Sequence, residues 1–291
     1  MSNLPLIGVT GASGQLGRLA IQSLLARDTP ADRIAAIARD PAKVADLAAR
    51  GVQVRQGDYD RPNTLDAALA GVDRLLLVSS SEVGKRAAQH QAVIDAAVRA
   101  GVGLLAYTSL LHADTSPLGL AAEHVQTEQA LQASGLPHVL LRNGWYAENS
   151  TAGIPGVLQH GTLLGSAGDG RLSIAARADY AEAAAIVIAS DDAQAGKVYE
   201  LAGDDAITLA GFAAELARQT GTPIAYQDLP QQDYRDALLA AGLPDFVAEM
   251  LSDSDAGAAK GALFDDSGTL GRLLGRPTTA MADVIAEAIA S

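Results

Sequence analysis

The chain lacks cysteine altogether, and aromatic residues make up only 4% of it, with a single tryptophan. The absence of cysteine excludes disulfides, thiol nucleophiles and thiolate metal ligands. The five histidines show no HxH or HxxxH spacing, so we expect no metal site. Basic residues are also scarce, because 21 Lys and Arg stand against 34 Asp and Glu. Nucleic acids are bound mainly through Lys and Arg, so we expect no nucleic-acid partner.

Long hydrophobic runs are missing as well, and no stretch approaches the ~18 apolar residues that would cross a bilayer. The N-terminal residues 1–5 carry no basic segment, so we expect no signal peptide and no membrane partner. Hydrophobic residues still form 48% of the 291, enough for a core built from Ala, Leu, Val and Ile. We therefore expect a cytoplasmic protein. A homodimer is compatible with the sequence but not required by it.

What the sequence does contain is a glycine-rich turn near its start. The β-prone run 6–10 leads to Gly11, Gly14 and Gly17, and apolar residues then recur at helical spacing. In such a turn the first glycine permits the bend, the second admits a pyrophosphate, and the third lets helix and strand pack closely. The helix N-terminus favours phosphate. The pattern predicts dinucleotide binding by Gly11, Ala12, Ser13, Gly14, Gln15 and Leu16, with a purely structural turn as the alternative.

Arg39 follows the predicted strand 33–38 and stands 22 positions after Gly17. Sites specific for NAD place an acidic residue about 20 positions on, where it binds the ribose 2′-hydroxyl. A guanidinium instead offers donors that match a 2′-phosphate, so Arg39 favours NADP(H). The alternative is an ordinary exposed arginine. Asp40 weakens the case, although it can serve to cap the next helix.

Strands and helices alternate regularly as far as about residue 150. Strands are predicted at 51–54, 73–78, 102–108 and 137–141, and helices at 40–50, 63–69, 85–100 and 118–133. The alternation predicts an α/β fold with a Rossmann-type, doubly wound parallel sheet.

Ligands bind at the carboxyl ends of the strands in such sheets. Asp58 follows one predicted strand as an adenine contact or a turn carboxylate. Ser79, Ser80 and Ser81 follow another, where they either contact the cofactor or only end the strand.

Beyond residue 150 the alternation breaks. Seven glycines and prolines between 153 and 170 predict loops with short strands. A helix is predicted from 177, a strand at 197–201, a helix at 208–219, and mostly helix from 231. We expect an NADP-binding Rossmann domain at 1–150 and a smaller, mostly helical substrate lobe at 151–291, partly interleaved with the sheet.

The Tyr-x-x-x-Lys pattern of short-chain dehydrogenases is missing, because none of Tyr107, Tyr146 and Tyr180 has lysine four positions later. Yet the glycine turn, Arg39 and the segments 108–114, 141–149 and 177–180 resemble the NmrA-like branch of atypical short-chain dehydrogenases/reductases. They are closest to its bacterial NAD(P)H:quinone oxidoreductases. The resemblance covers almost the whole chain, including 263–267 and 275–279.

The resemblance implies an oxidoreductase that transfers hydride from NADPH to a quinone without flavin. It implies NADP(H) along the glycine turn, the 2′-phosphate at Arg39, and Ser79, Ser80 and Ser81 under the cofactor. It also implies a loop beside the nicotinamide, made of Asn143, Gly144, Trp145, Tyr146, Ala147 and Glu148. A non-catalytic NADP(H)-sensing regulator is the alternative, since such proteins also occur in this branch.

The candidate catalytic residues are His124 and Tyr146. Many NmrA-like reductases carry a lysine on the helix after the fifth strand, and that position falls here on His124. We expect His124 to act as an acid or ribose partner, or else to be a solvated helix histidine.

His112, Trp145 and Arg177 are the candidate substrate contacts. Trp145 and Tyr146 either stack on a quinone or plug an interface. Arg177 either holds a quinone oxygen or a phosphate, or pairs with a nearby carboxylate.

Overall fold

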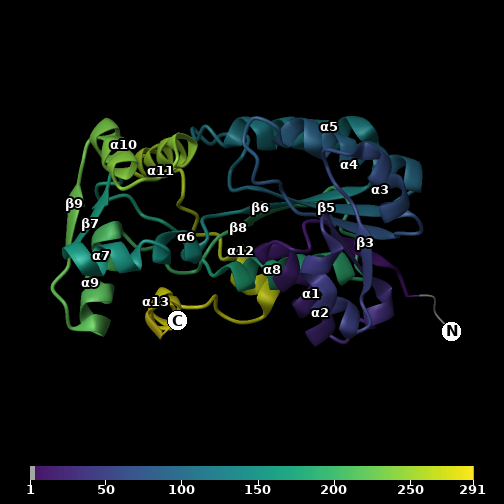
Figure 1. Cartoon of the computed structure of the whole chain (residues 1–291), viewed down its shortest axis with the longest axis horizontal. Coiled ribbons are helices and arrows are strands. Elements are labelled where there is room, and N and C mark those ends of the chain that lie inside the picture. Colours follow the sequence, from purple (N-terminus) through teal and green to yellow (C-terminus); the bar gives the residue numbers. More distant parts are fainter. Residues whose placement is uncertain (1–3, 291) are drawn as a thin grey trace. The chain divides into compact units, whose positions relative to one another are not determined.

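The computed structural model describes residues 4–290 and contains a seven-stranded and a two-stranded sheet (Figure 1). By its internal contacts the chain divides into two packing units. The first holds the described chain up to Ala113, then Ala122–Asn143 and Arg177–Tyr199. The second holds Asp114–Ala121, Gly144–Ala176 and the chain from Glu200 onward. The functional division into 1–150 and 151–291 stays a prediction.

The large sheet has the strand order β3-β2-β1-β4-β5-β6-β8, in which the order reverses at β1. The strand pairings from β3 through β6 along this order are parallel, and Ile7 of β1 lies between Ile34 and Arg74. This order confirms the predicted doubly wound fold. The strands are β1 (Ile7–Val9), β2 (Ile34–Ala38), β3 (Gln53–Gln56), β4 (Arg74–Leu77), β5 (Leu104–Leu110), β6 (His138–Asn143) and β8 (Val198–Leu201).

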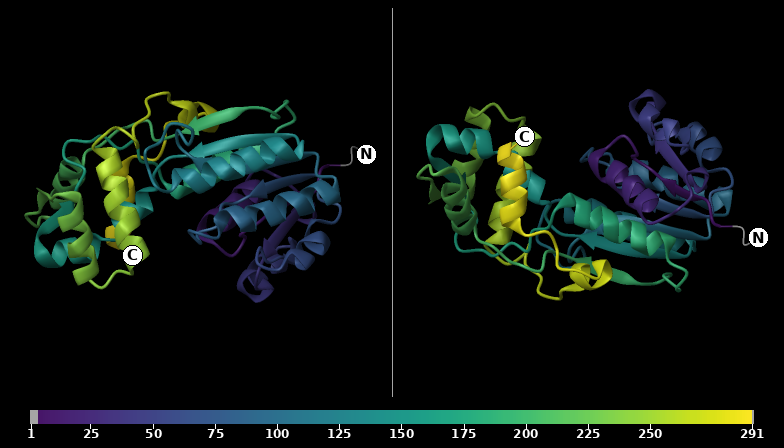
Figure 2. Two further views of the ribbon diagram at one scale, coloured as in Figure 1. Left: turned by 90° about the horizontal axis from the view of Figure 1, so that it is seen from above. Right: turned by 90° about the horizontal axis from the view of Figure 1, so that it is seen from below.

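Helices cover both faces of this sheet. Helices α1, α2 and α8 lie on one face and α3, α4 and α5 on the other (Figures 1 and 2). Helix α1 packs on α8, and α3 packs on α4. The helices are α1 (Gln15–Ala26), α2 (Ala45–Ala49), α3 (Pro62–Leu69), α4 (Arg86–Ala100), α5 (Ala121–Ser134) and α8 (Arg177–Ala189). The buried residues between the layers are almost all aliphatic, as the composition predicts, with Tyr107 and Tyr180 as the largest.

Local signals set several helix ends. Gly101 ends α4 with φ +69°, the left-handed conformation that a glycine adopts readily. The Oδ1 of Asp40 accepts from the N–H of Ala42 at 3.0 Å, which confirms Asp40 as a cap. The single helix predicted at 40–50 is wrong. A 3₁₀ turn at Pro41–Val44 precedes the short α2, as is common at helix N-termini.

The second unit is mostly helical, with β7 (Thr162–Gly165) and β9 (Ala225–Asp228) paired in parallel. Its helices are α6 (Ala147–Thr151), α7 (Ile154–His160), α9 (Leu209–Thr220), α10 (Gln231–Ala240), α11 (Asp245–Ala258), α12 (Thr269–Leu274) and α13 (Met281–Ala290). The predicted loop at 143–149 becomes helical at Ala147.

The expectation of only loops and short strands between 153 and 170 is wrong, because α7 lies there. Gly153 and Gly161 bound this helix, and Pro155 occupies its first turn, where proline is tolerated. Ile154 and Val157 are buried in a cluster that includes Phe212, Leu216 and Ile285. The glycines therefore mark the ends of a helix that is stabilised by packing.

Gly17 fixes the distance between α1 and the turn that precedes it. A Cβ atom at Gly17 would lie 2.4 Å from the backbone oxygen of Gly11 and 3.1 Å from that of Thr10. Gly11 itself has φ +60°, which disfavours any side chain there. Both positions behave as the glycine spacing predicts.

We expect Gly17→Ala to lower the free energy of unfolding by about 1–3 kcal/mol, because the new methyl group meets rigid backbone. Gly156→Ala is the matched control, since a Cβ atom at this helical glycine meets nothing within 4 Å. Urea unfolding of both variants measures the difference. Equal stabilities would show that the turn relaxes to accept a side chain.

Candidate dinucleotide site

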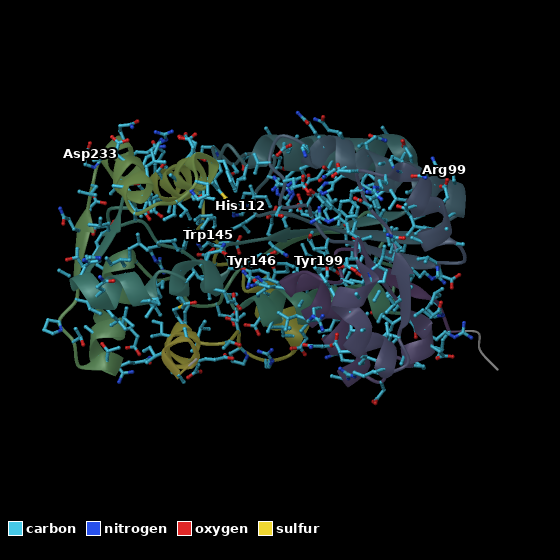
Figure 3. All side chains as sticks on the ribbon, viewed as in Figure 1. Arg99, His112, Trp145, Tyr146, Tyr199 and Asp233 are labelled. Carbon is cyan, nitrogen blue, oxygen red and sulfur yellow. The ribbon has the colours of Figure 1, made fainter. Side chains whose placement is uncertain are left out.

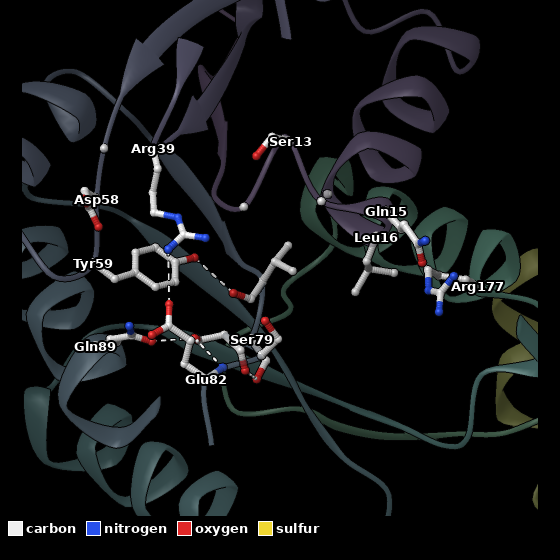
Figure 4. A pocket seen from close by; sticks show the side chains of 17 residues that line it. Ser13, Gln15, Leu16, Arg39, Asp58, Tyr59, Ser79, Glu82, Gln89 and Arg177 are labelled. Carbon is white, nitrogen blue, oxygen red and sulfur yellow. Dashed lines mark hydrogen bonds and ion pairs between the residues drawn. The ribbon is translucent and has the colours of Figure 1, made fainter. Parts of the chain in front are cut away.

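A cavity of about 430 Å³ lies at the carboxyl ends of β1, β2, β3 and β4 in the first unit (Figure 4). Its wall combines the glycine turn, the residues after each of these strands, and the start of α8. It therefore occupies the edge of the sheet where the sequence analysis predicts the cofactor. The predicted site residues in its wall are Gly11, Ser13, Gly14, Gln15, Leu16, Arg39, Asp58, Ser79, Ser80, Ser81 and Arg177.

Other predicted residues lie elsewhere. Ala12 is fully buried behind the turn, and its N–H donates to the carbonyl oxygen of Ile37 at 3.1 Å, which ties the turn to β2. Asn143 is buried at the end of β6. His112 is half-buried and has φ +51°, a conformation that costs a non-glycine residue on the order of 1 kcal/mol.

The rest of the predicted nicotinamide loop, from Gly144 to Glu148, belongs to the second unit. Trp145 and Tyr146 are half-buried on the stretch that leads into α6 (Figure 3). The N–H of Ala147 and the carbonyl oxygen of Trp145 both bond to Ala175. Backbone pairing therefore holds this stretch, and its place beside the nicotinamide stays a prediction.

Five further residues in the cavity wall were missed by the sequence analysis: Gly57, Tyr59, Val78, Glu82 and Gln89. The hydroxyl of Tyr59 donates to the carbonyl oxygen of Val78 at 3.0 Å, which joins the ends of β3 and β4. Tyr59 directly follows Asp58 at a predicted strand end, so its position gave a usable signal. Glu82 and Gln89 gave none, because charged and polar residues are common in loops and on helices.

Arg39 and Asp58 lie near the mouth of the cavity. The Arg39 side chain is 68% exposed, and its Nη1 lies 3.2 Å from Oε1 of Glu82. The Oδ1 of Asp58 accepts from the N–H of Asp60 at 3.1 Å, and its Oδ2 lies 3.7 Å from Nε of Arg61. The Asp58 carboxylate thus stabilises its own turn while it lines the cavity.

The serines after β4 are held by their backbone. The N–H of Ser79 donates to Oγ1 of Thr108 at 2.9 Å, and the N–H of Ser80 donates to Nε2 of His90 at 2.9 Å. The carbonyl oxygen of Ser80 accepts from Nε of Arg86 at 2.8 Å. Helix α4 therefore holds Ser80 from both sides, which fixes this part of the cavity wall.

His90 has a defined tautomer. Its Nε2 accepts from Ser80, so the ring proton sits on Nδ1, which lies 2.9 Å from Oγ1 of Thr127. Thr127 in turn donates to the carbonyl oxygen of Glu123 at 2.9 Å. Burial, with a smaller contribution from the positive charge of Arg86, lowers the pKa of His90 to about 3. A neutral imidazole is the form that this chain of hydrogen bonds requires.

His124 lies on α5 and is only 7% exposed, so the prediction of a solvated helix histidine is wrong. Its Nδ1 lies 2.8 Å from the hydroxyl of Tyr107. Burial, followed by the charge of Arg86 and the proximity of His90, lowers the pKa of His124 to about 3. Burial also raises the pKa of Tyr107, so the phenol stays protonated. The pair therefore consists of two neutral groups near pH 7.

Within residues 4–290, no three His, Asp or Glu side chains are grouped so that they could hold a metal ion. None of the helices described in this range is both long and apolar enough to cross a membrane.

Comparison with known proteins gives a consistent picture. A family model described as NAD(P)H-binding matches residues 11–191. Quinone oxidoreductase 2 of Escherichia coli is 57% identical over 280 residues, which cover 96% of this chain and 97% of that protein. The resemblance inferred from the sequence motifs is confirmed.

Solved structures agree with the sequence comparison. The NADPH-dependent quinone oxidoreductase of E. coli, solved with NADPH, matches with a TM-score of 0.94 at 56% identity, covering 97% of this chain and 99% of that one. The triphenylmethane reductase of Citrobacter sp., complexed with NADP(H), matches with a TM-score of 0.92 at 34% identity and the same coverage. The likeness extends over nearly the whole chain.

Because His90 and His124 are buried, we expect the folded state to lose stability at acidic pH. Their pKa values of about 3 lie below the ~6.5 of an unfolded chain, so the unfolded state binds more protons below that pH. Stability that is complete above about pH 6.5 is then lost as the pH falls, by up to ~1.4 kcal/mol per pH unit for each histidine.

Urea unfolding at about pH 7 and about pH 5 measures this loss. We expect His90→Gln and His124→Gln each to reduce the pH dependence, because each removes one titrating group. His160→Gln, at an exposed position, is the control. A pH dependence equal to that of the wild type in both buried variants would contradict the assignment.

Proposed function

We propose that this chain, which belongs to the NAD(P)H-binding family, is an NADPH-dependent oxidoreductase that transfers hydride to quinones without a flavin. The observation that carries the proposal is the cavity of the first unit, which combines a glycine turn with a guanidinium at its mouth. Its relatives of known structure and sequence include quinone oxidoreductases matched over nearly their full length. The quinone itself is the proposed small-molecule partner.

The residues present fit NADPH. A side chain at Gly17 would meet backbone, so α1 begins close to the end of β1 and directs its N-terminus at the cavity. Helix α1, described in full, has no acidic residue in its first turn that would oppose a pyrophosphate. Arg39 would hold the 2′-phosphate, and Arg177, beside Gln15 in the wall, a phosphate of the pyrophosphate (Figure 4).

When bound, NADPH supplies the hydride. The chain's own residues then have to hold the cofactor and keep water from the reacting face. The rigid Ser79–Ser80 backbone gives the ribose a fixed wall. We assign Asn143, Gly144, Trp145, Tyr146, Ala147 and Glu148 to the nicotinamide side of the site. Trp145 and His112 are the proposed quinone contacts, with stacking on Trp145 contributing about 0.5–1.5 kcal/mol.

Proton transfer places a modest demand on the protein, because a hydroquinone oxygen is stable as an anion. His124 and Tyr146 remain the proposed catalytic residues. We assign His124 the role of a neutral hydrogen-bonding group, because its lowered pKa leaves the ring uncharged near pH 7. When the Tyr107 hydroxyl donates to Nδ1, the ring proton sits on Nε2.

The proposal includes a cytoplasmic location and no nucleic-acid partner, and it is compatible with a homodimer. The lack of a nucleic-acid partner is supported by the scarcity of basic residues in the sequence and by the acidic net charge of −13. Light scattering measures the assembly directly.

Turnover separates this proposal from a non-catalytic NADP(H) sensor. Purified protein is mixed with NADPH and simple benzoquinones or naphthoquinones, and the absorbance of the reduced cofactor is followed. We expect turnover without added flavin. Cofactor binding without any turnover across these quinones would favour the sensor.

We expect Arg39→Ala to raise the Kd for NADPH about 10- to 100-fold, because a charge-assisted bond to phosphate contributes roughly 1.5–3 kcal/mol. The Kd for NADH changes little, since its ribose carries no 2′-phosphate. Titration of cofactor fluorescence measures both constants, with exposed Arg50→Ala as the control. Equal effects on the two cofactors would remove Arg39 from the 2′-phosphate.

For His124 we expect a pH–rate profile between about pH 5.5 and 8 that has the same shape in the wild type and in His124→Gln, because the ring does not titrate there. A lower kcat in the variant at every pH is the result expected if the neutral ring donates a hydrogen bond. An inflection near pH 6.5 that disappears in His124→Gln would instead identify an imidazolium acid.

A further inference from the structure

We propose that Glu82 sets the cofactor selectivity of this site, because its carboxylate binds Arg39 until a 2′-phosphate displaces it. The inference rests on the proposed binding of NADPH in the cavity. Glu82 therefore reduces the preference for NADPH over NADH that Arg39 alone would give.

The carboxylate of Glu82 is shared between two cations. Its Oε1 lies 3.2 Å from Nη1 of Arg39, and its Oε2 lies 3.2 Å from Nζ of Lys85. Glu82 also lines the cavity, where Figure 4 shows it facing Arg39. An acidic group thus stands beside the cation that the phosphate would use.

The backbone of Glu82 is anchored on both sides. Its N–H donates to Oγ of Ser80 at 3.1 Å, and its carbonyl oxygen accepts from the N–H groups of Lys85 and Arg86 at 3.1 and 3.0 Å. The carbonyl oxygen of Ser80 is bound to Arg86 in turn. The loop therefore keeps its place while the cofactor enters, and only the Glu82 side chain has to rotate.

The exchange favours a phosphate over the carboxylate. The Arg39–Glu82 pair is exposed, with 68% and 33% of the two side chains accessible, and exposed ion pairs are weak. A phosphate monoester carries about −1.5 to −2 charges near pH 7 and accepts two parallel bonds from one guanidinium. After displacement Glu82 keeps its contact with Lys85, which neutralises it close to the phosphate.

NADH binds without this exchange, because its 2′-hydroxyl carries no charge and does not compete with Glu82 for Arg39. NADPH has to break the Arg39–Glu82 pair and then tolerate a nearby carboxylate. The cost of breaking the pair therefore weakens the binding of NADPH alone. It lowers the ratio of the affinity for NADPH to the affinity for NADH.

The test compares the Kd values of NADPH and NADH in the wild type and in Glu82→Gln. We expect the variant to bind NADPH about two- to fivefold more tightly, the factor that a weak exposed ion pair corresponds to, with the Kd for NADH unchanged. The fragments 2′-AMP and 5′-AMP should reproduce the difference. High salt should reduce it, because salt screens exposed charges.

Two further variants make the result specific. Glu182→Gln changes the net charge equally and breaks another exposed pair of the first unit, Arg27–Glu182, also at 3.2 Å. It should leave both Kd values unchanged. In an Arg39→Ala background, Glu82→Gln should change the Kd ratio less than it does in the wild type, because the group for which carboxylate and phosphate compete is gone.

The inference is overturned if Glu82→Gln leaves the ratio of NADPH to NADH affinity unchanged, or if it weakens NADH instead, which would make Glu82 an acceptor for the 2′-hydroxyl. Failure of the proposed binding of NADPH, on which the inference rests, looks different. In that case the wild type binds neither cofactor, or Arg39→Ala has no effect on NADPH.

Discussion

The contact between the backbone of α1 and the turn before it is the constraint on which the site depends. With a side chain at Gly17, the helix would have to move away from Gly11 and Thr10. Because the two backbones touch, the N-terminus of α1 lies at the end of β1, where the cavity opens. The parallel sheet then brings the ends of β2 and β4 to the same edge on either side of β1, and with them Arg39 and the serines.

Helix α4 provides a second constraint on the site. This helix supplies His90 and Arg86 to the peptide groups of Ser80, and a neutral His90 passes the hydrogen-bond chain on to α5 through Thr127. One wall of the cavity is therefore built from backbone atoms held by buried side chains. The Arg39 side chain, in contrast, is 68% exposed and can change its contacts when a ligand binds. The segment after β4 is therefore the rigid part of the site, and the residue after β2 is the adaptable part.

Much of this could be predicted from the sequence, because it depends on neighbours along the chain. The glycine spacing, the Asp40 cap and the alternation of strands and helices are local signals, and each is found where expected. Helix α7 was missed because its stability comes from packing against Phe212 and Ile285, which lie far along the chain. Glu82 can face Arg39 only because β2 and β4 lie on either side of β1 in the sheet. No local sequence pattern predicts this contact.

The position of helix α8 limits how the chain can be truncated or recombined. It lies after residue 150, yet it packs on α1, and Tyr180, Ala184 and Ile188 are buried in the first unit. No single uninterrupted fragment consists of the first unit alone, because segments of the second unit interrupt it twice. A gene fragment that stopped near residue 150 would leave the apolar side of α1 uncovered and remove Arg177 from the cavity. Recombination that exchanges one unit between related proteins must therefore exchange several separate chain segments together.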